Sequence, residues 1–241
     1  SHAAAYAVVS YQTAYLKYYH PVEFMAALMT SVKDNVTKVS EYIMSCRQMG
    51  MKIMPPDINE GEGGFSVSDG AIRYGLSAIK SIGQSVVDEI VRERTEHGKF
   101  RSLEDFIDRM SGREVNKRTL ESFIKSGAMD GLPGTRKQKS MVCGSMVDQN
   151  NKEKKNTMEG QMSLFDFAAE EDKKSFQITF PNVGEYSREE YLAYEKEMLG
   201  VYVSGHPLEE FIGTWEKNVT AKSSDFVVDE ETGSAVVHDG A

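Results

Sequence analysis

Short runs of helical periodicity, each ended by a glycine or a proline, fill most of the first 148 residues. Apolar residues recur at three-to-four spacing over residues 3–19, and His20-Pro21 then ends that run. Gly50, Gly83 and Gly127 end or separate later runs in the same way. Because glycine and proline stop a helix rather than extend it, this pattern predicts a mainly α chain built from short helices.

Several expected helices carry recognisable end signals. Pro21 suits the first position of a helix, Asn116 suits an N-cap, and Ser187 suits an N-cap with Glu190 as its capping-box partner. The expected buried residues are Phe24, Leu28 and Val32 in the helix after Pro21, and Val39, Ile43 and Met44 in the next. The predicted spans are 3–19, a helix from Pro21, about Val36–Met49, Gln84–Glu96, 102–109, 116–126, Thr135 to about Asp148, Ser187–Leu199, and a short helix ending near Trp215.

One β-hairpin interrupts the helices. Pro55-Pro56 and the glycines between residues 61 and 64 forbid a long helix over residues 51–75. Phe65–Ser68 and Ala71–Tyr74 alternate in polarity, and the turn dipeptide Asp69-Gly70 separates them. We expect these two segments to be the one clearly marked strand pair of the chain.

Composition excludes several classes of protein. Two cysteines without a CxxC pair and five scattered histidines predict neither a disulfide framework nor a metal site. Apolar runs fall short of the roughly 18–20 residues of a membrane span, so we expect a soluble intracellular chain. The net charge of −9 is uneven, since residues 73–158 hold 17 basic and 12 acidic side chains and residues 159–241 hold 6 and 18. A polyanion would therefore bind the middle of the chain.

The middle of the chain contains two patterns of helix, turn and helix. In the first, Lys80-Ser81-Ile82-Gly83 joins a short helix over Leu76–Lys80 to the helix that begins Gln84-Ser85. Ile82 would fill the core beneath the turn, and Gly83 would supply a positive φ. The unpaired N–H groups at the next helix start would then form a phosphate cradle, which the helix dipole favours.

The second pattern turns at Gly127 and continues with the helix after Thr135. Basic residues surround it, namely Arg113, Lys117, Arg118, Lys125, Arg136, Lys137 and Lys139. A tandem helix-hairpin-helix unit of this kind would grip the backbone of duplex DNA without reading bases. An ordinary helical hairpin domain with solvated Lys and Arg explains the same pattern, so both interpretations stay open. The candidate DNA-binding residues are Lys80, Ser81, Ile82, Gly83, Gln84, Ser85, Arg113, Lys117, Arg118, Gly127, Arg136 and Lys137.

An apolar peptide lies inside a flexible polar linker over residues 149–185. Residues 149–160 and 168–175 are polar and charged, whereas Gln161-Met162-Ser163-Leu164-Phe165 carries large apolar side chains. One interpretation is a docking peptide, in which Gln161 forms hydrogen bonds while Leu164 and Phe165 fill a pocket on a partner. The other is a helical turn that folds back on its own domain.

The opening run from Ser1 to Lys17, SHAAAYAVVSYQTAYLK, closely resembles the fingers segment of the C-family replicative DNA polymerases, the alpha subunits of bacterial DNA polymerase III. The match continues in the same order along almost the whole chain. It includes Pro21–Leu28, Pro55–Asn59, Ile72–Leu76, Val115–Leu120, Ile124–Ala128, Glu197–Tyr202 and Ser204–Leu208.

This resemblance implies an order of parts. They are the end of the fingers (1–64), the β-hairpin with the tandem helix-hairpin-helix unit (65–148), the linker with a sliding-clamp-binding peptide at Gln161–Phe165 (149–185), connecting helices (186–217) and an incomplete OB-fold start (218–241). It also implies that Ser1 and His2 lie near the phosphates of the incoming nucleotide. The Mg²⁺ ions of nucleotidyl transfer belong to palm aspartates upstream of residue 1, so this chain alone is expected to be inactive, without a catalytic residue, cofactor or metal.

The function implied by the resemblance is part of a replicative DNA-directed DNA polymerase, a cytoplasmic and nucleoid-associated bacterial enzyme. The expected partners are double-stranded primer–template DNA, the sliding clamp and other subunits of the polymerase III holoenzyme, but not a membrane. Two alternatives remain: a non-catalytic helix-hairpin-helix module of a repair factor, and an adaptor that binds only protein.

Overall fold

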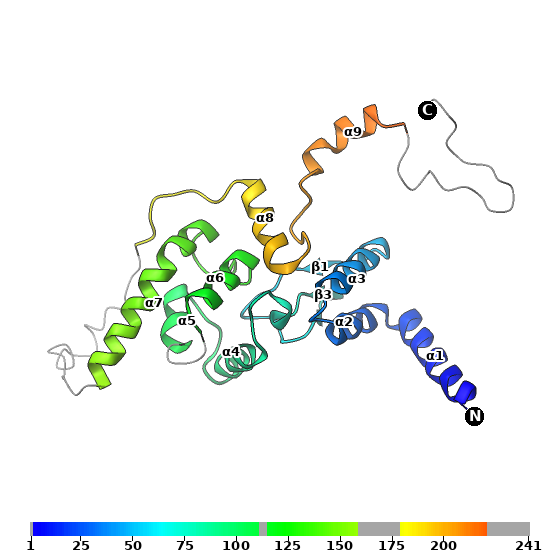
Figure 1. The fold of residues 1–241 in the computed structure, drawn as a ribbon, viewed down its shortest axis with the longest axis horizontal. Helices are drawn as coiled ribbons and strands as arrows, with labels where there is room; N and C mark the ends of the chain where they lie inside the picture. Colours follow the sequence, from blue (N-terminus) through cyan, green and yellow to red (C-terminus); the bar gives the residue numbers. More distant parts are fainter. Residues whose placement is uncertain (1, 111–114, 159–178, 221–241) are drawn as a thin grey trace. The chain divides into compact units, whose positions relative to one another are not determined.

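The computed structural model describes residues 2–110, 115–158 and 179–220, whose helices and strands are shown in Figure 1. The chain divides into two compact units, Ser1–Ser204 and Gly205–Ala241. The first unit contains α1 (His2–Tyr19), α2 (Pro21–Ser31), α3 (Val36–Gln48), β1 (Ile53–Met54), β2 (Ser66–Ser68), β3 (Ala71–Arg73), the 3-10 turn η1 (Leu76–Ala78), α4 (Gln84–His97), α5 (Leu103–Met110), α6 (Lys117–Ser126), α7 (Arg136–Met158) and α8 (Arg188–Leu199). The prediction of a mainly α chain with a small β element is confirmed.

The first two helices differ in burial, although both have helical periodicity. Every residue of α1 is exposed, whereas α2 buries three residues, Met25, Ala26 and Met29. The predicted residues Phe24, Leu28 and Val32 are only partly buried, so the prediction of that face is wrong by about one position. Because α2 is apolar on most of its surface, periodicity alone could not select the side that faces the sheet and α3.

Helix α3 follows its predicted pattern in part. Val39 and Ile43 are buried as predicted, but Met44 is 61% exposed. Cys46 takes the third buried position, which continues the spacing of four and three residues along one helix face.

The predicted β-hairpin is confirmed and gains a third strand. β2 and β3 are antiparallel, with Ser68 opposite Ala71, and the turn residues Asp69 and Gly70 have φ values of 51° and 71°. These positive φ values are those of a two-residue hairpin turn. β1 pairs with β3 in parallel, giving the order β1-β3-β2. This strand escaped prediction because it has only two residues before Pro55-Pro56 and no periodicity of its own.

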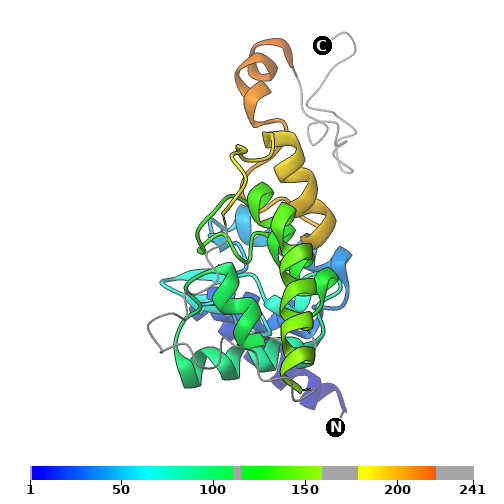
Figure 2. The same ribbon diagram turned by 90° about the vertical axis from the view of Figure 1, so that its left-hand side faces the viewer.

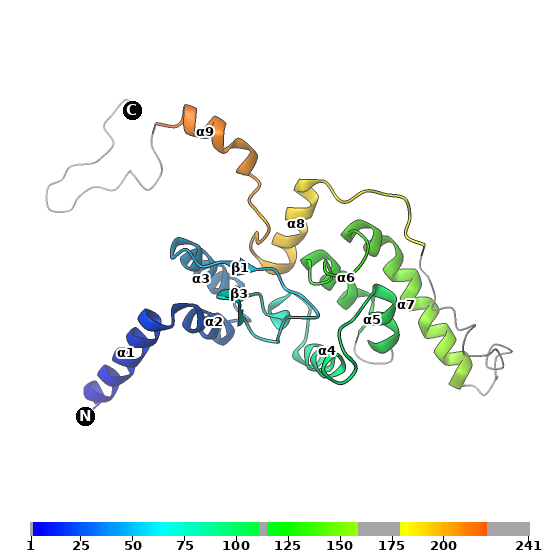
Figure 3. The ribbon, with the colours of Figure 1, turned by 180° about the vertical axis from the view of Figure 1, so that it is seen from behind.

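Helices α4 to α7 form the middle of the first unit, and α6 packs against both α7 and α8 (Figure 2, Figure 3). Asn116 caps α6 by accepting a hydrogen bond from the Thr119 N–H at 3.0 Å, and Gly127 ends the helix at φ 85°. Helix α7 runs to Met158, ten residues beyond its predicted end near Asp148 and into the predicted linker. This extension, QNNKEKKNTM, holds three lysines, one glutamine and one glutamate, which favour helix, beside three asparagines, which favour it less.

Two hydrogen bonds join the C-terminal end of α8 to Tyr74, directly after strand β3, and to Lys80 of the first predicted hairpin turn. Its predicted capping box is present, with Ser187 and Glu190 hydrogen-bonded to each other's backbone N–H. At the other end, the Tyr74 hydroxyl donates to the Leu199 carbonyl at 2.8 Å. The Lys80 N–H donates to the Met198 carbonyl at 2.9 Å. One hydrophobic core therefore runs from α2 and α3 through the hairpin helices to α8.

The second unit contains the 3-10 turn η4 (Glu209–Phe211) and α9 (Ile212–Asn218). Together they replace the single short helix predicted to end near Trp215. The predicted OB-fold strands lie in residues 221–241, outside the described residues. No helix among the described residues is long and apolar enough to cross a membrane.

Candidate nucleic-acid interface

The first hairpin turn has the predicted position but not the predicted backbone. Ile82 is buried and anchors the turn in the core, as expected. The left-handed residue is Ser81, with φ 68°, whereas Gly83 is extended at φ −82° and ψ 155°. The expectation that Gly83 supplies the positive φ is therefore wrong, because it is the N-cap of α4 and N-caps are extended.

The start of α4 is accessible. Its N-cap residue, Gly83, has no side chain with which to cap the helix. Lys80, Ser81, Gly83, Gln84 and Ser85 are all exposed there. A helix start carries N–H groups without intrahelical partners and the positive end of the helix dipole, so this end suits an anion.

Helix α6 begins with two basic residues, of which Arg118 contacts this turn. The Arg118 guanidinium donates a hydrogen bond to the Ser81 hydroxyl at 3.2 Å, which joins the first turn of α6 to the first hairpin turn. The Lys117 side chain crosses α7 at Gly144, where an added Cβ would lie 3.1 Å from Lys117 Nζ. Cations are unfavourable in the first turn of a helix, so both residues oppose the α6 dipole. A bound anion would offset that cost.

Lys33 is a further basic residue at this site, and sequence reasoning missed it. It follows α2, and its ammonium donates to the Gln84 amide oxygen at 2.7 Å and to the Ser77 hydroxyl at 3.1 Å. The Gln84 amide nitrogen donates in turn to Asp88 at 2.8 Å. Lys33 is 51 positions from Gln84, so local sequence carries no signal for this contact.

The second hairpin turn is buried over Gly127–Met129 and exposed at Asp130. Gly127 is buried and left-handed, and a Cβ there would overlap the Arg136 guanidinium. The Arg136 side chain is only 1% exposed. The assignments of Gly127 and Arg136 to DNA contact are therefore corrected: both residues serve internal packing. Lys139 is likewise buried, and its ammonium donates to the Met129 carbonyl at 2.7 Å.

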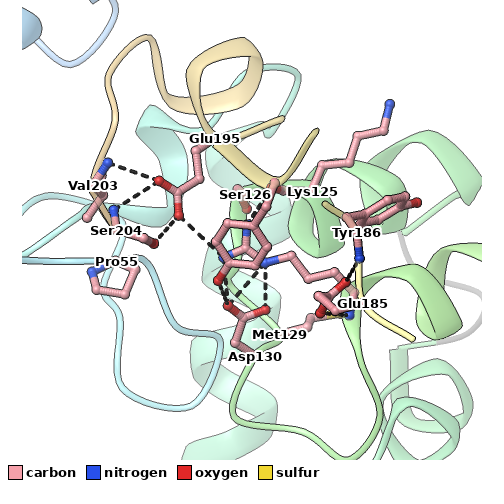
Figure 4. A network of polar contacts seen from close by, with 12 residues as sticks. Pro55, Lys125, Ser126, Met129, Asp130, Glu185, Tyr186, Glu195, Val203 and Ser204 are labelled. Carbon is pink, nitrogen blue, oxygen red and sulfur yellow. Dashed lines mark hydrogen bonds and ion pairs between the residues drawn. The ribbon is translucent and has the colours of Figure 1, made fainter. Parts of the chain in front are cut away.

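Arg136 contacts Asp130, Lys125 and Glu195, which are labelled in the polar network of Figure 4. It binds the Asp130 carboxylate through three contacts of 2.6–3.1 Å and the Lys125 carbonyl at 3.2 Å, and it lies 3.5 Å from Glu195. Its guanidinium also stacks 3.6 Å from the Tyr191 ring centre. Burial opposes its charge, but the hydrogen bond and ion pair with Asp130 outweigh burial and raise the Arg136 pKa. Burial also raises the pKa of Tyr191 to about 12.

Glu195 extends this network toward residues 203–204. It is fully buried, and its carboxylate accepts the N–H groups of Val203 and Ser204, each at 3.0 Å. The Ser204 hydroxyl donates to the same carboxylate (Figure 4). α8 is thus held to the second hairpin turn by charge-assisted hydrogen bonds.

A carboxylate already occupies the start of α7. Glu185 accepts the Arg136 N–H at 2.9 Å and the Lys137 N–H at 3.1 Å. Thr135 and Gln138 also cap this end by reciprocal side-chain-to-backbone hydrogen bonds of 2.9 and 3.1 Å. The start of α7 is therefore capped by side chains, unlike the N-cap position of α4.

Of the remaining predicted site residues, the structure describes His2 and Lys137 but not the others. His2 is exposed at the start of α1, with its ring 5.5 Å from that of Tyr6. Lys137 is half-buried beside the Tyr186 ring. Ser1, Arg113 and the peptide Gln161, Met162, Ser163, Leu164 and Phe165 lie outside the described residues. Within the described ranges, no group of three or more His, Cys, Asp or Glu is placed to hold a metal ion.

Comparison with known proteins adds two findings. Residues 50–139 match the helix-hairpin-helix motif family. Relatives named DNA polymerase III subunit alpha include those of Borreliella burgdorferi, 43% identical over 88% of this chain, and Campylobacter jejuni, 42% identical over 94%. A third, from Deinococcus radiodurans, is 42% identical over 90%. The chain spans 16–19% of the length of these three relatives.

Proposed function

Because the chain is homologous to a segment of the bacterial DNA polymerase III alpha subunits, we propose that it is part of a replicative DNA-directed DNA polymerase and that its first hairpin turn binds duplex DNA. One observation carries the DNA-binding proposal. The exposed start of α4, whose N-cap Gly83 carries no capping side chain, lies beside Arg118 and within the helix-hairpin-helix match.

The proposed contact is to a phosphate of the DNA backbone. The N–H groups at the start of α4 would donate to the phosphate oxygens, while Lys80, Lys117 and Arg118 supply positive charge. Lys33, through its hydrogen bond to Gln84, would fix the side chain at the first position of α4. Contacts of this kind carry no base information, so binding should be independent of sequence and sensitive to salt.

A charge-reversal experiment tests this proposal. We expect Lys80→Glu combined with Lys117→Glu and Arg118→Glu to weaken binding to a fluorescent primer–template. If three phosphate contacts are lost, the plot of log affinity against log salt concentration should become less steep. Its slope should be smaller in magnitude by about 2.7. The matched control reverses three exposed lysines elsewhere, Lys17, Lys38 and Lys52. Equal losses from the two triple variants would refute a localised site, and unchanged affinity would favour the protein-only adaptor.

A second proposed contact is with the sliding clamp, through the peptide Gln161-Met162-Ser163-Leu164-Phe165. Its support is the Gln-x-x-Leu-Phe form between two polar segments. A weak tether of this kind would keep the polymerase near the primer end by raising its effective concentration. Leu164→Ala with Phe165→Ala should abolish clamp binding in a fluorescence anisotropy titration, whereas Met162→Ala with Ser163→Ala should preserve it. Full affinity in the first variant would rule the peptide out.

The polymerisation chemistry is proposed for the whole polymerase, which would act on the nucleoid in the cytoplasm with other holoenzyme subunits. Mg²⁺ would be held by its palm, and Ser1 and His2 would face the nucleotide phosphates. The alternative repair-factor module gives no reason for the polymerase-like residues 1–30. Deleting this segment should therefore impair primer extension by the whole polymerase if the proposal is correct.

A further inference from the structure

The helical stretch of the second unit, η4 with α9, has one strongly apolar face. Five large apolar residues lie along it, and each has between 38% and 61% of its surface exposed: Leu208, Phe211, Ile212, Trp215 and Val219. At about 100° per residue, these five positions fall within an arc of about 100°. The charged residues of the same stretch fall outside this arc. We name the five apolar residues the 208–219 face.

This face needs a covering partner. A contiguous exposed apolar patch on a protein marks an interaction site. Trp215 lies near the middle of the stretch, and a tryptophan ring carries one of the largest apolar surfaces of any side chain. Helix α9 has only seven residues, and a helix this short is not stable in water without packing. The 208–219 face is therefore the side on which the helix would be held.

The rest of the second unit supplies a segment that matches this need. The unit extends to Ala241, and its sequence beyond Thr220 contains two short apolar runs, FVV at residues 226–228 and AVV at residues 235–237. Polar residues and Gly233 separate the two runs. Valine-rich runs joined by a polar segment with a glycine are typical of a β-hairpin. An isolated two-stranded hairpin is only marginally stable in water and gains stability by packing against a helix.

The connecting chain is long enough to bring the two runs onto the helix. Val219 is extended, and the seven residue steps from Val219 to Phe226 span up to about 23 Å. The stretch from Leu208 to Val219 is shorter, about 17 Å for a helix. A segment tethered this closely has a high effective concentration at the face. A second copy of the chain would instead lose translational and rotational freedom on binding, so the tethered segment is favoured.

We propose that residues 226–237 form a β-hairpin that covers the 208–219 face. The second unit would then have a core of its own, in which one helix packs on one hairpin. The hairpin would shield Trp215 from water, while the acidic residues Asp229, Glu230 and Glu231 of its connection would remain in solvent. This inference does not depend on the proposed DNA and clamp contacts.

Fluorescence tests the proposal, because Trp215 is the single tryptophan of the chain. The experiment compares the full chain with a chain that ends at Thr220, excited at wavelengths that tyrosine does not absorb. The tryptophan of the full chain should emit at a shorter wavelength and be quenched several-fold less by acrylamide. Equal emission and quenching in the two chains would overturn the proposal. If shielding in both chains then increases with protein concentration, a second copy covers the face instead.

Two paired substitutions locate the covering segment. Val227→Asp with Val228→Asp should raise quenching to the level of the shortened chain. Neighbouring residues of a strand point to opposite faces, so one of these two must face the helix. Ser223→Asp with Ser224→Asp is the matched control, because it adds the same charge at adjacent polar positions, and it should leave the emission unchanged. Equal effects of the two pairs would contradict the proposal.

Nuclear magnetic resonance of the full chain tests the contact without relying on a variant that folds. Cross-relaxation should connect the Trp215 indole protons to valine methyl groups whose signals are absent from the chain that ends at Thr220. The lack of any such connection would overturn the proposal. None of these results alters the DNA affinity expected of the first hairpin turn, so the two proposals fail independently.

Discussion

Arg136 provides the most direct test of how the second hairpin is held together. Replacing it with Met keeps an apolar stem but removes the guanidinium that contacts Asp130, Glu195 and a backbone carbonyl. Removing one partner of a buried ion pair costs about 3–5 kcal/mol, because the other charge stays buried without compensation. Asp130 is 39% exposed and can be hydrated, whereas Glu195 is fully buried. Glu195 would lose this cation but keep its hydrogen bonds from Val203 and Ser204, which compensate its charge in part.

Urea denaturation followed by far-UV circular dichroism measures this cost. With a urea dependence of about 2 kcal/mol per molar, a loss of 3–5 kcal/mol lowers the midpoint by about 1.5–2.5 M. The control is Arg92→Met, which breaks the exposed ion pair with Glu89 and should cost less than about 1 kcal/mol. Equal losses in both variants would refute the reasoning.

Three further predictions concern local features. Gly127→Ala should destabilise the first unit by at least about 2 kcal/mol in urea denaturation, because a left-handed residue gains a side chain against Arg136. Burial raises the pKa of the Cys46 thiol to about 11. At pH 8, Cys46 should therefore be alkylated far more slowly in the folded chain than in urea, as measured by mass spectrometry. The hydrogen bonds from Ser187 lower the Glu190 pKa, so this capping box should stabilise the fold above the ordinary Glu pKa and lose that effect as pH falls through the lowered value. When melting temperature is measured against pH, Glu190→Gln should reduce its decrease at acidic pH. An unchanged decrease would contradict this assignment.

Local sequence determined much of this protein, because caps and turns depend on residues three or four positions apart. Asn116 and Gly127 mark the two ends of α6 in sequence and in structure. Asp69-Gly70 likewise predicted the hairpin turn, since both residues accept a positive φ. The match to polymerase alpha subunits was also readable from sequence, over motifs spread along the chain.

Only the tertiary structure decided which of the predicted features are accessible. Sequence predicted basic residues around both hairpin turns, yet Glu185, 49 positions from Arg136, caps the helix start at α7. Arg136 is basic and follows a turn, but the partners that bury it come from α8 and residue 130. Lys33, which lies between α2 and α3, donates a hydrogen bond to Gln84 at the start of α4. Periodicity describes one segment at a time, so contacts between distant segments, which determine burial and charge pairing, lie beyond it.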